Sequence, residues 1–152
     1  MKAKMEVKRV LNQLWHLGKC SDIYMFHHVT TKPEKLLSLT LETDAFLRFL
    51  DRPHTYASLA RTMEDKDYPG LSAITFDDGP GAYTAQLLDE LAARDVKATF
   101  FVSGYRAANY PETLKRMVSE GHQLASHTQN HENLNTLSAA KIADEISRTQ
   151  DY

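Results

Sequence analysis

The sequence predicts an α/β fold in which parallel strands alternate with helices. Stretches of strand type occur at residues 71–76, 96–102 and 123–126. Between and after them come stretches whose apolar residues recur every three or four positions, at residues 84–94, 111–120 and 138–150. This alternation is typical of a parallel sheet with helical crossovers. We expect the three strands to lie side by side, connected in the right-handed sense, with their carboxyl ends along one edge.

Each of these elements has local support. The helix predicted at 84–94 has leucines one turn apart, which would face a core. Residues 96–102 are rich in β-branched and aromatic side chains, which favour a strand. The helix at 111–120 begins with Pro111, which suits a first turn, and stops before Gly121.

The first part of the chain predicts a different arrangement. We expect residues 1–70 to be a lead-in segment of helices and a strand, and residues 71–152 to be the first part of the main domain. The apolar pattern predicts helices up to Gly18, at 44–50 and at 55–64, a strand at 23–26 and a polar connection at 65–70.

Composition limits the classes of function. The 152 residues suit one domain, and the net charge of −2 comes with no Lys/Arg run long enough to indicate nucleic-acid binding. No stretch has the length of a membrane span or of a signal-peptide core, so we expect a cytoplasmic protein if Met1 is the native start. Cys20 is the only cysteine and cannot form an internal disulfide.

Two acidic residues come directly after the predicted strand at 71–76. Asp77 and Asp78 are adjacent, and neighbouring strand residues point in opposite directions, so the two carboxylates can have different roles. Gly79 and Pro80 then turn the chain. An Asp-Gly pair alone is more typical of a plain turn.

Two histidines come after the strand at 123–126. If the chain forms a helical turn there, His127 and His131 stand on one face and can chelate a divalent metal. An isolated His-x-x-x-His is more often a pair of surface residues. The carboxyl ends of parallel strands lie together, however, so these histidines and the aspartates favour a two-histidine, one-carboxylate site. The remaining carboxylate could act as a base, which predicts metal-assisted hydrolysis of an amide or ester.

The residues Thr-Phe-Asp-Asp-Gly-Pro at 75–80 and His-Thr-Gln-Asn-His at 127–131 resemble the first two motifs of the NodB-homology polysaccharide deacetylases, carbohydrate esterase family 4. Residues 96–104 and 121–122 also resemble that family. The resemblance implies a distorted (β/α) barrel with Asp77 as catalytic base and Asp78, His127 and His131 as ligands of zinc or another divalent ion. It also implies an acetylated polysaccharide or oligosaccharide as substrate.

The sequence departs from the family after the second motif. The family continues with an Arg-containing motif, an Asp- and Trp-containing motif and a Leu-x-His motif that supplies the acid. None of these comes after His131 within the 152 residues, so we expect an incomplete barrel whose free strand edges favour homo-oligomers. Two alternatives remain open: a non-catalytic metal- or glycan-binding remnant, and an amidase for a small molecule.

Two further pairs of residues bear on the predicted site. His27 and His28 could reach it if the strand at 23–26 joins the same sheet, but a packed or solvated strand-end histidine is the more common case. Phe100 and Phe101 lie inside a predicted strand, so we expect them in the core rather than beneath a sugar ring.

Overall fold

The structure is a computed structural model that describes residues 22–30, 40–64 and 71–151. The predicted helix ending at Gly18, Cys20 and the connection at 65–70 lie outside these described residues. The strands are β1 (Ile23–Phe26), β2 (His28–Thr30), β3 (Thr40–Glu42), β4 (Thr55–Ala57), β5 (Leu71–Gly79), β6 (Thr99–Val102) and β7 (Gln123–Ser126). The α-helices are α2 (Thr43–Leu50), α3 (Leu59–Glu64), α4 (Thr84–Ala92), α5 (Gly104–Ala107), α6 (Pro111–Ser119) and α7 (Ala139–Ser147). Two 3₁₀ helices are η2 (Leu134–Thr136) and η3 (Arg148–Asp151).

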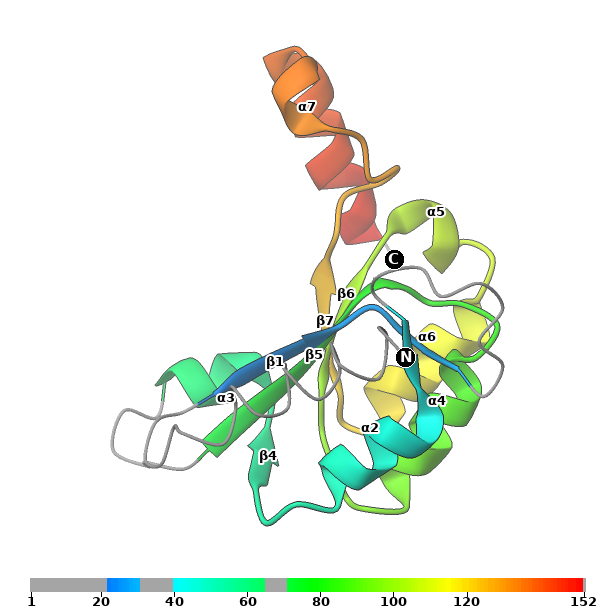
Figure 1. The fold of residues 1–152 in the computed structure, drawn as a ribbon. Coiled ribbons are helices and arrows are strands. Elements are labelled where there is room, and N and C mark those ends of the chain that lie inside the picture. Colours follow the sequence, from blue (N-terminus) through cyan, green and yellow to red (C-terminus); the bar gives the residue numbers. More distant parts are fainter. Residues whose placement is uncertain (1–21, 31–39, 65–70, 152) are drawn as a thin grey trace, which may run out of the picture.

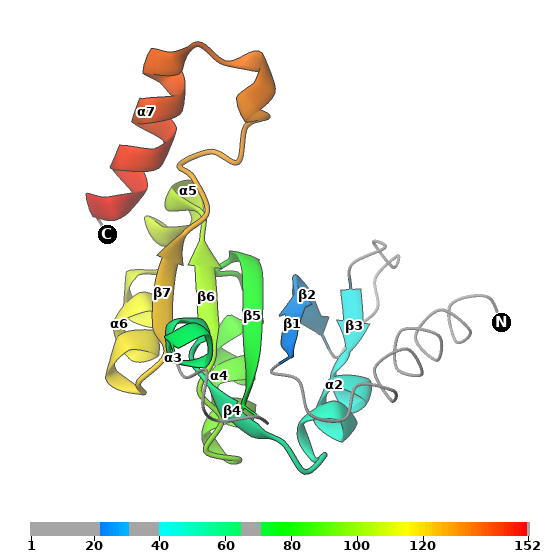
Figure 2. The same cartoon turned by 90° about the vertical axis from the view of Figure 1, so that its left-hand side faces the viewer.

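The main sheet is parallel, and its strand order is β1-β5-β6-β7, with β4 paired to the beginning of β5 (Figure 2). Phe76 of β5 lies opposite Phe26 of β1 and Phe100 of β6. The prediction that the last three strands lie side by side is therefore confirmed. A separate parallel pair joins β2 and β3.

Helices α2, α4 and α6 cover one face of the main sheet (Figures 1 and 2). The core between these layers is rich in aromatic rings: Phe26 and Phe46 have centroids 5.2 Å apart, and those of Phe76 and Phe100 are 5.1 Å apart. Phe100 is 1% exposed, which confirms its predicted place in the core. Burying each such side chain stabilises the fold by roughly 1.5–3 kcal/mol, so the aromatic cluster holds the sheet against its helices.

The opposite face of the sheet is covered in part by α3 and contains buried polar groups. The hydroxyl of Thr99, which is fully buried, accepts a hydrogen bond from the backbone N–H of Leu59 at 2.9 Å and donates one to Gln123 Oε1 at 3.0 Å. The backbone N–H of Ala60 also donates to Gln123 Oε1 at 3.1 Å. These bonds tie the start of α3 to β6 and β7.

The predicted helix at 55–64 is wrong in its first part. Residues 55–57 form β4, and the helix begins only at Leu59. Ser58 separates the two, because its hydroxyl accepts from the Arg61 N–H and its carbonyl from the Thr62 N–H. A side chain that bonds the first turn in this way favours a helix start. The short elements β2, β3 and α5 were not predicted.

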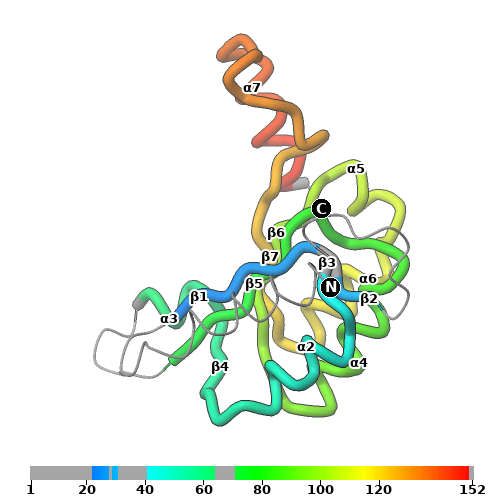
Figure 3. Tube along the Cα trace, viewed as in Figure 1, coloured from blue at the N-terminus to red at the C-terminus, as the bar shows by residue number. Residues whose placement is uncertain are grey.

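Helix α7 stands beyond the carboxyl ends of the strands, away from the main sheet (Figures 1 and 3). The chain leaves β7, passes through η2 and then runs back along α7 and η3. Among the described residues, β1 and β7 form the edges of the main sheet, which does not close into a barrel. No helix in the described part of the chain is both long enough and apolar enough to cross a membrane.

Candidate metal centre

Three of the predicted site residues converge at the carboxyl ends of β5 and β7. Oδ1 of Asp78 lies 3.2 Å from Nε2 of His127 and 3.3 Å from Nε2 of His131. The two imidazole rings have centroids 4.8 Å apart. One ligand atom from each residue lies within 4.8 Å of the others, so a single divalent ion could contact all three.

The backbone of β5 presents Asp78 by leaving regular strand geometry. The pairing of β5 with β6 shifts between Phe76 and Gly79, and Asp78 has φ 65. An irregularity of this kind turns a side chain from the direction that the pleat would give it. The peptide bond between Gly79 and Pro80 is cis. The regular strand alternation that predicts opposite directions for Asp77 and Asp78 therefore does not hold at Asp78.

The histidines are brought together by a loop, and not by the helical turn on which the prediction from the sequence depends. No residue from His127 to His131 is helical, and Thr128 and His131 have φ 65 and φ 57. The loop continues from β7, where the His127 N–H donates to the Val102 carbonyl at 2.9 Å. The His131 N–H then donates to the Thr128 hydroxyl at 3.1 Å, which closes the loop.

Asp77, the predicted base, lies beside the three converging residues and is less solvated. Its Oδ1 is buried and has no hydrogen-bond partner among the described residues. Burial raises the pKa of Asp77 above its usual value, the neighbouring Asp78 charge raises it further, and His127, His27 and His131 oppose the shift. A carboxylate with an unused oxygen and a raised pKa is suited to accept a proton.

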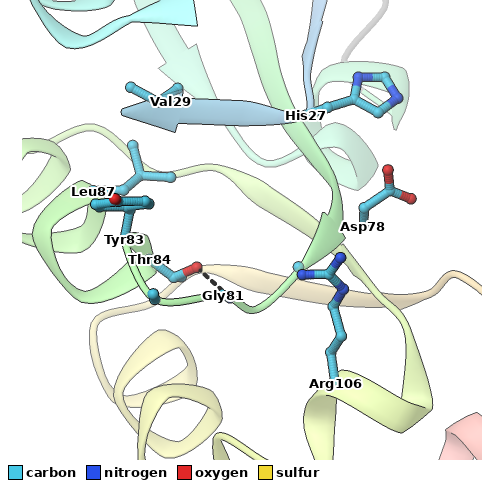
Figure 4. Close-up of a pocket in the computed structure, with 10 residues that line it drawn as sticks. His27, Val29, Asp78, Gly81, Tyr83, Thr84, Leu87 and Arg106 are labelled. Atoms are coloured by element: carbon cyan, nitrogen blue, oxygen red, sulfur yellow. Dashed lines mark hydrogen bonds between the residues drawn. The ribbon is translucent and has the colours of Figure 1, made fainter. Parts of the chain in front are cut away.

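A pocket of about 250 Å³ adjoins Asp78. Its polar end is formed by His27, Asp78 and Arg106 (Figure 4). Its other end is lined by Val29, Tyr83 and Leu87. The structure thus brings His27 to the site, contrary to the more common case of a solvated strand-end histidine, because β1 joins the main sheet next to β5. The side chain of His28 lies outside the described residues.

Further residues near the site were not found from the sequence. Arg106 lines the pocket, and Glu145 of α7 contacts the histidine loop. Glu145 comes three residues after Ile142, so its place beside the apolar side of the predicted helix is the one sequence signal that could have found it. In the structure Glu145 is 3% exposed. Phe101 is half-buried, and its ring centroid lies 6.3 Å from that of His127, so it faces the site rather than the aromatic core.

The donor set fits a divalent metal ion. Two imidazole nitrogens and one carboxylate oxygen converge, and the two histidines belong to a loop that is anchored to the sheet. Catalytic zinc sites use this kind of donor set and leave one position open. Asp77 contributes no atom to this group and remains available beside it.

A family model described as "Polysaccharide deacetylase" matches residues 64–152. A chitin deacetylase of Colletotrichum lindemuthianum is 52% identical over 88 residues, which cover 55% of this chain and 36% of that protein. The chain spans about a third of the length of the curated relatives it matches.

Solved structures agree with these matches. The peptidoglycan deacetylase PdaC from Bacillus subtilis is 48% identical and superimposes with a TM-score of 0.51 over 52% of this chain and 40% of that chain. The Streptococcus pyogenes deacetylase PplD is 23% identical and has a TM-score of 0.74 over 88% of this chain and 67% of that chain. The second likeness concerns the fold alone, and it confirms the predicted α/β class, of which the described sheet forms an open part.

Proposed function

We propose, because this chain belongs to the polysaccharide deacetylase family, that Asp78, His127 and His131 bind a divalent metal ion beside the base Asp77. The reaction would be the hydrolysis of acetyl groups on a polysaccharide. The observation that carries the proposal is the convergence of both imidazole Nε2 atoms on Asp78 Oδ1, at 3.2 and 3.3 Å. Two of the named relatives are described as deacetylases of chitin and of peptidoglycan, which favours an acetylated amino-sugar polymer as substrate.

Zinc is the ion that this donor set favours, because two imidazoles and one carboxylate are typical ligands of catalytic zinc. When bound, such a cation would activate water and polarise the acetyl carbonyl group. Asp77 would accept a proton from the attacking water, since its Oδ1 has no other partner among the described residues. The proton held by Asp77 would then pass to the leaving nitrogen or oxygen as its bond to the carbonyl carbon breaks, so that acetate and the free amine or hydroxyl of the sugar are released.

Metal content tests the ligand assignment. We expect zinc to bind the wild-type protein in equimolar amount and to be lost from the Asp78→Ala and His127→Ala variants, as measured by elemental analysis after dialysis. His54→Ala is the matched control, because His54 is exposed and belongs to another part of the fold. Unchanged zinc content in both ligand variants would refute the assignment.

Turnover tests the role of Asp77 and separates the alternatives. On acetylated chito-oligomers with added metal, we expect Asp77→Asn to keep its zinc and to lose activity by about 10²–10⁴-fold, as for removal of a general base. Zinc binding without any turnover would support the non-catalytic alternative. Hydrolysis of small amides but not of chito-oligomers would support the amidase.

A further inference from the structure

The loop that carries the two histidines is held by one buried carboxylate, Glu145 of α7. Glu145 is 3% exposed, although glutamate is almost never fully buried without partners. Its Oε2 accepts a hydrogen bond from the backbone N–H of Asn130 at 2.7 Å, and its Oε1 accepts one from Asn130 Nδ2 at 2.6 Å. Both carboxylate oxygens thus bind Asn130, the residue that precedes His131.

The backbone of Glu145 contacts the same loop. Its carbonyl accepts a hydrogen bond from the Gln129 N–H at 2.8 Å. On the other side, α5 donates to the loop: the Gly104 N–H bonds the Thr128 carbonyl at 3.0 Å and the Tyr105 N–H bonds the Gln129 carbonyl at 2.9 Å. Each residue between His127 and His131 is therefore bonded to α5, to α7 or to both.

The conformation of the loop requires such support. Thr128 and His131 both adopt positive φ, at 65 and 57. A residue other than glycine in this region costs on the order of 1–3 kcal/mol, and it stays there only when the surrounding structure holds it. The bond from the His131 N–H to the Thr128 hydroxyl lies within the loop, so it fixes neither histidine relative to Asp78. The His127 N–H bond to the Val102 carbonyl ties the start of the loop to β6, and the bonds to α5 and α7 hold the residues between the two histidines.

We propose that Glu145 is a positioning residue for the metal centre. By binding Asn130 and Gln129, it keeps His127 and His131 at the separation at which both Nε2 atoms reach Asp78. This inference rests on the proposed metal binding and adds a requirement to it: α7, which contributes no ligand, sets the affinity. Residues that orient metal ligands without binding the metal typically contribute about 10–100-fold to affinity.

Zinc affinity, measured by calorimetry on the whole chain, tests the role of Glu145. We expect Glu145→Ala to bind zinc about 10–100-fold more weakly than the wild-type protein. Glu145→Gln keeps one acceptor oxygen and should lose less. Asp144→Asn is the matched control, because it removes a neighbouring carboxylate that is 59% exposed and pairs only with Arg148 among the described residues. Its affinity should equal that of the wild type.

A cobalt spectrum separates positioning from a merely structural role. At saturating Co²⁺, the visible absorption bands of Glu145→Gln should differ from those of the wild type, because the ligands meet the ion in a changed geometry. A residue that only stabilises α7 would leave these bands unchanged. If both Glu145 variants fail to fold, Asn130→Ala decides, since it removes only the Nδ2 donor. It should weaken zinc binding several-fold.

The outcomes distinguish the two proposals. Failure of the wild-type protein to bind zinc would refute the metal site itself. Zinc binding by the wild type together with affinities within about twofold for the folded variants, or with unchanged cobalt bands, would refute only the role of Glu145.

Discussion

Single residues of the candidate metal centre adopt backbone conformations that residues other than glycine rarely adopt. Asp78, Thr128 and His131 all have positive φ, and two of these three are proposed ligands. The strain is tolerated because hydrogen bonds hold the chain around each residue. Strand β5 pairs with β6 on both sides of Asp78, and α5 and α7 bond the loop that contains Thr128 and His131. The ligand geometry is therefore maintained by neighbours rather than by the local preferences of the ligands.

His122 provides a prediction at the residue scale. It precedes β7, is 7% exposed, and its Nδ1 accepts a hydrogen bond from the Ala98 N–H at 3.1 Å. Burial lowers the pKa of His122 below its ordinary value of 6.5; the Lys97 charge lowers it further, and Glu120 opposes. The folded protein therefore favours the neutral ring. We expect its contribution to stability to be complete above about pH 6.5 and to decrease as the pH falls below that value.

Urea unfolding at about pH 7.5 and about pH 5.5 measures this dependence. His122→Asn is the comparison, because an asparagine oxygen can accept from the Ala98 N–H and does not titrate. The variant should lose less stability than the wild type between the two pH values. An equal loss in both proteins would show that His122 does not contribute to the pH dependence.

At the scale of elements, the sequence predicted what depends on short spacings and missed what depends on distant partners. Apolar runs and motifs indicate strands β5, β6 and β7 and the proposed ligand residues at the carboxyl ends of β5 and β7. Residues 55–57 pair with β5, so their strand conformation depends on residues 71–73. The histidine loop replaces a helical turn because α5 and α7 hold it. Glu145 and Arg106 lie outside the two sequence motifs, and only the folding of the chain brings them to the site.

The contact between α3 and the sheet depends on the hydroxyl of Thr99, so removal of this hydroxyl should destabilise the fold. Thr99→Val keeps the shape of a fully buried side chain and removes its bonds to the Leu59 N–H and Gln123. We expect the free energy of unfolding to fall by about 1–3 kcal/mol, because buried polar groups lose their partner. Chemical denaturation measures the change. Thr75→Val is the control: Thr75 is 3% exposed, pairs with Thr99 across the sheet and makes no side-chain hydrogen bond among the described residues. Equal losses in the two variants would contradict the role of the Thr99 hydroxyl.

At the scale of the whole molecule, the described sheet is open while its site is largely assembled. Strands β5, β6 and β7, with the hydrogen bonds from α5 and α7 to the histidine loop, bring Asp78, His127 and His131 together. The proposed metal binding therefore requires only parts of the fold that the described residues contain. The two edge strands, β1 and β7, have no outer neighbour in the main sheet as far as the structure describes it. Such edges tend to pair with other chains.

The open edge at β1 predicts that the chain associates with copies of itself. Beside its free edge, β1 exposes two large apolar side chains, Ile23 at 55% and Met25 at 60%. We expect the 152-residue chain to self-associate as its concentration rises, as measured by sedimentation velocity. Met25→Lys should weaken association by about tenfold or more, because burial of one such side chain stabilises a contact by roughly 1.5–3 kcal/mol and a charged edge strand resists pairing. Val118→Lys is the matched control, since Val118 is also 60% exposed but lies on α6, away from the edge. A monomer at all concentrations, or equal effects of the two lysines, would show that β1 does not mediate association.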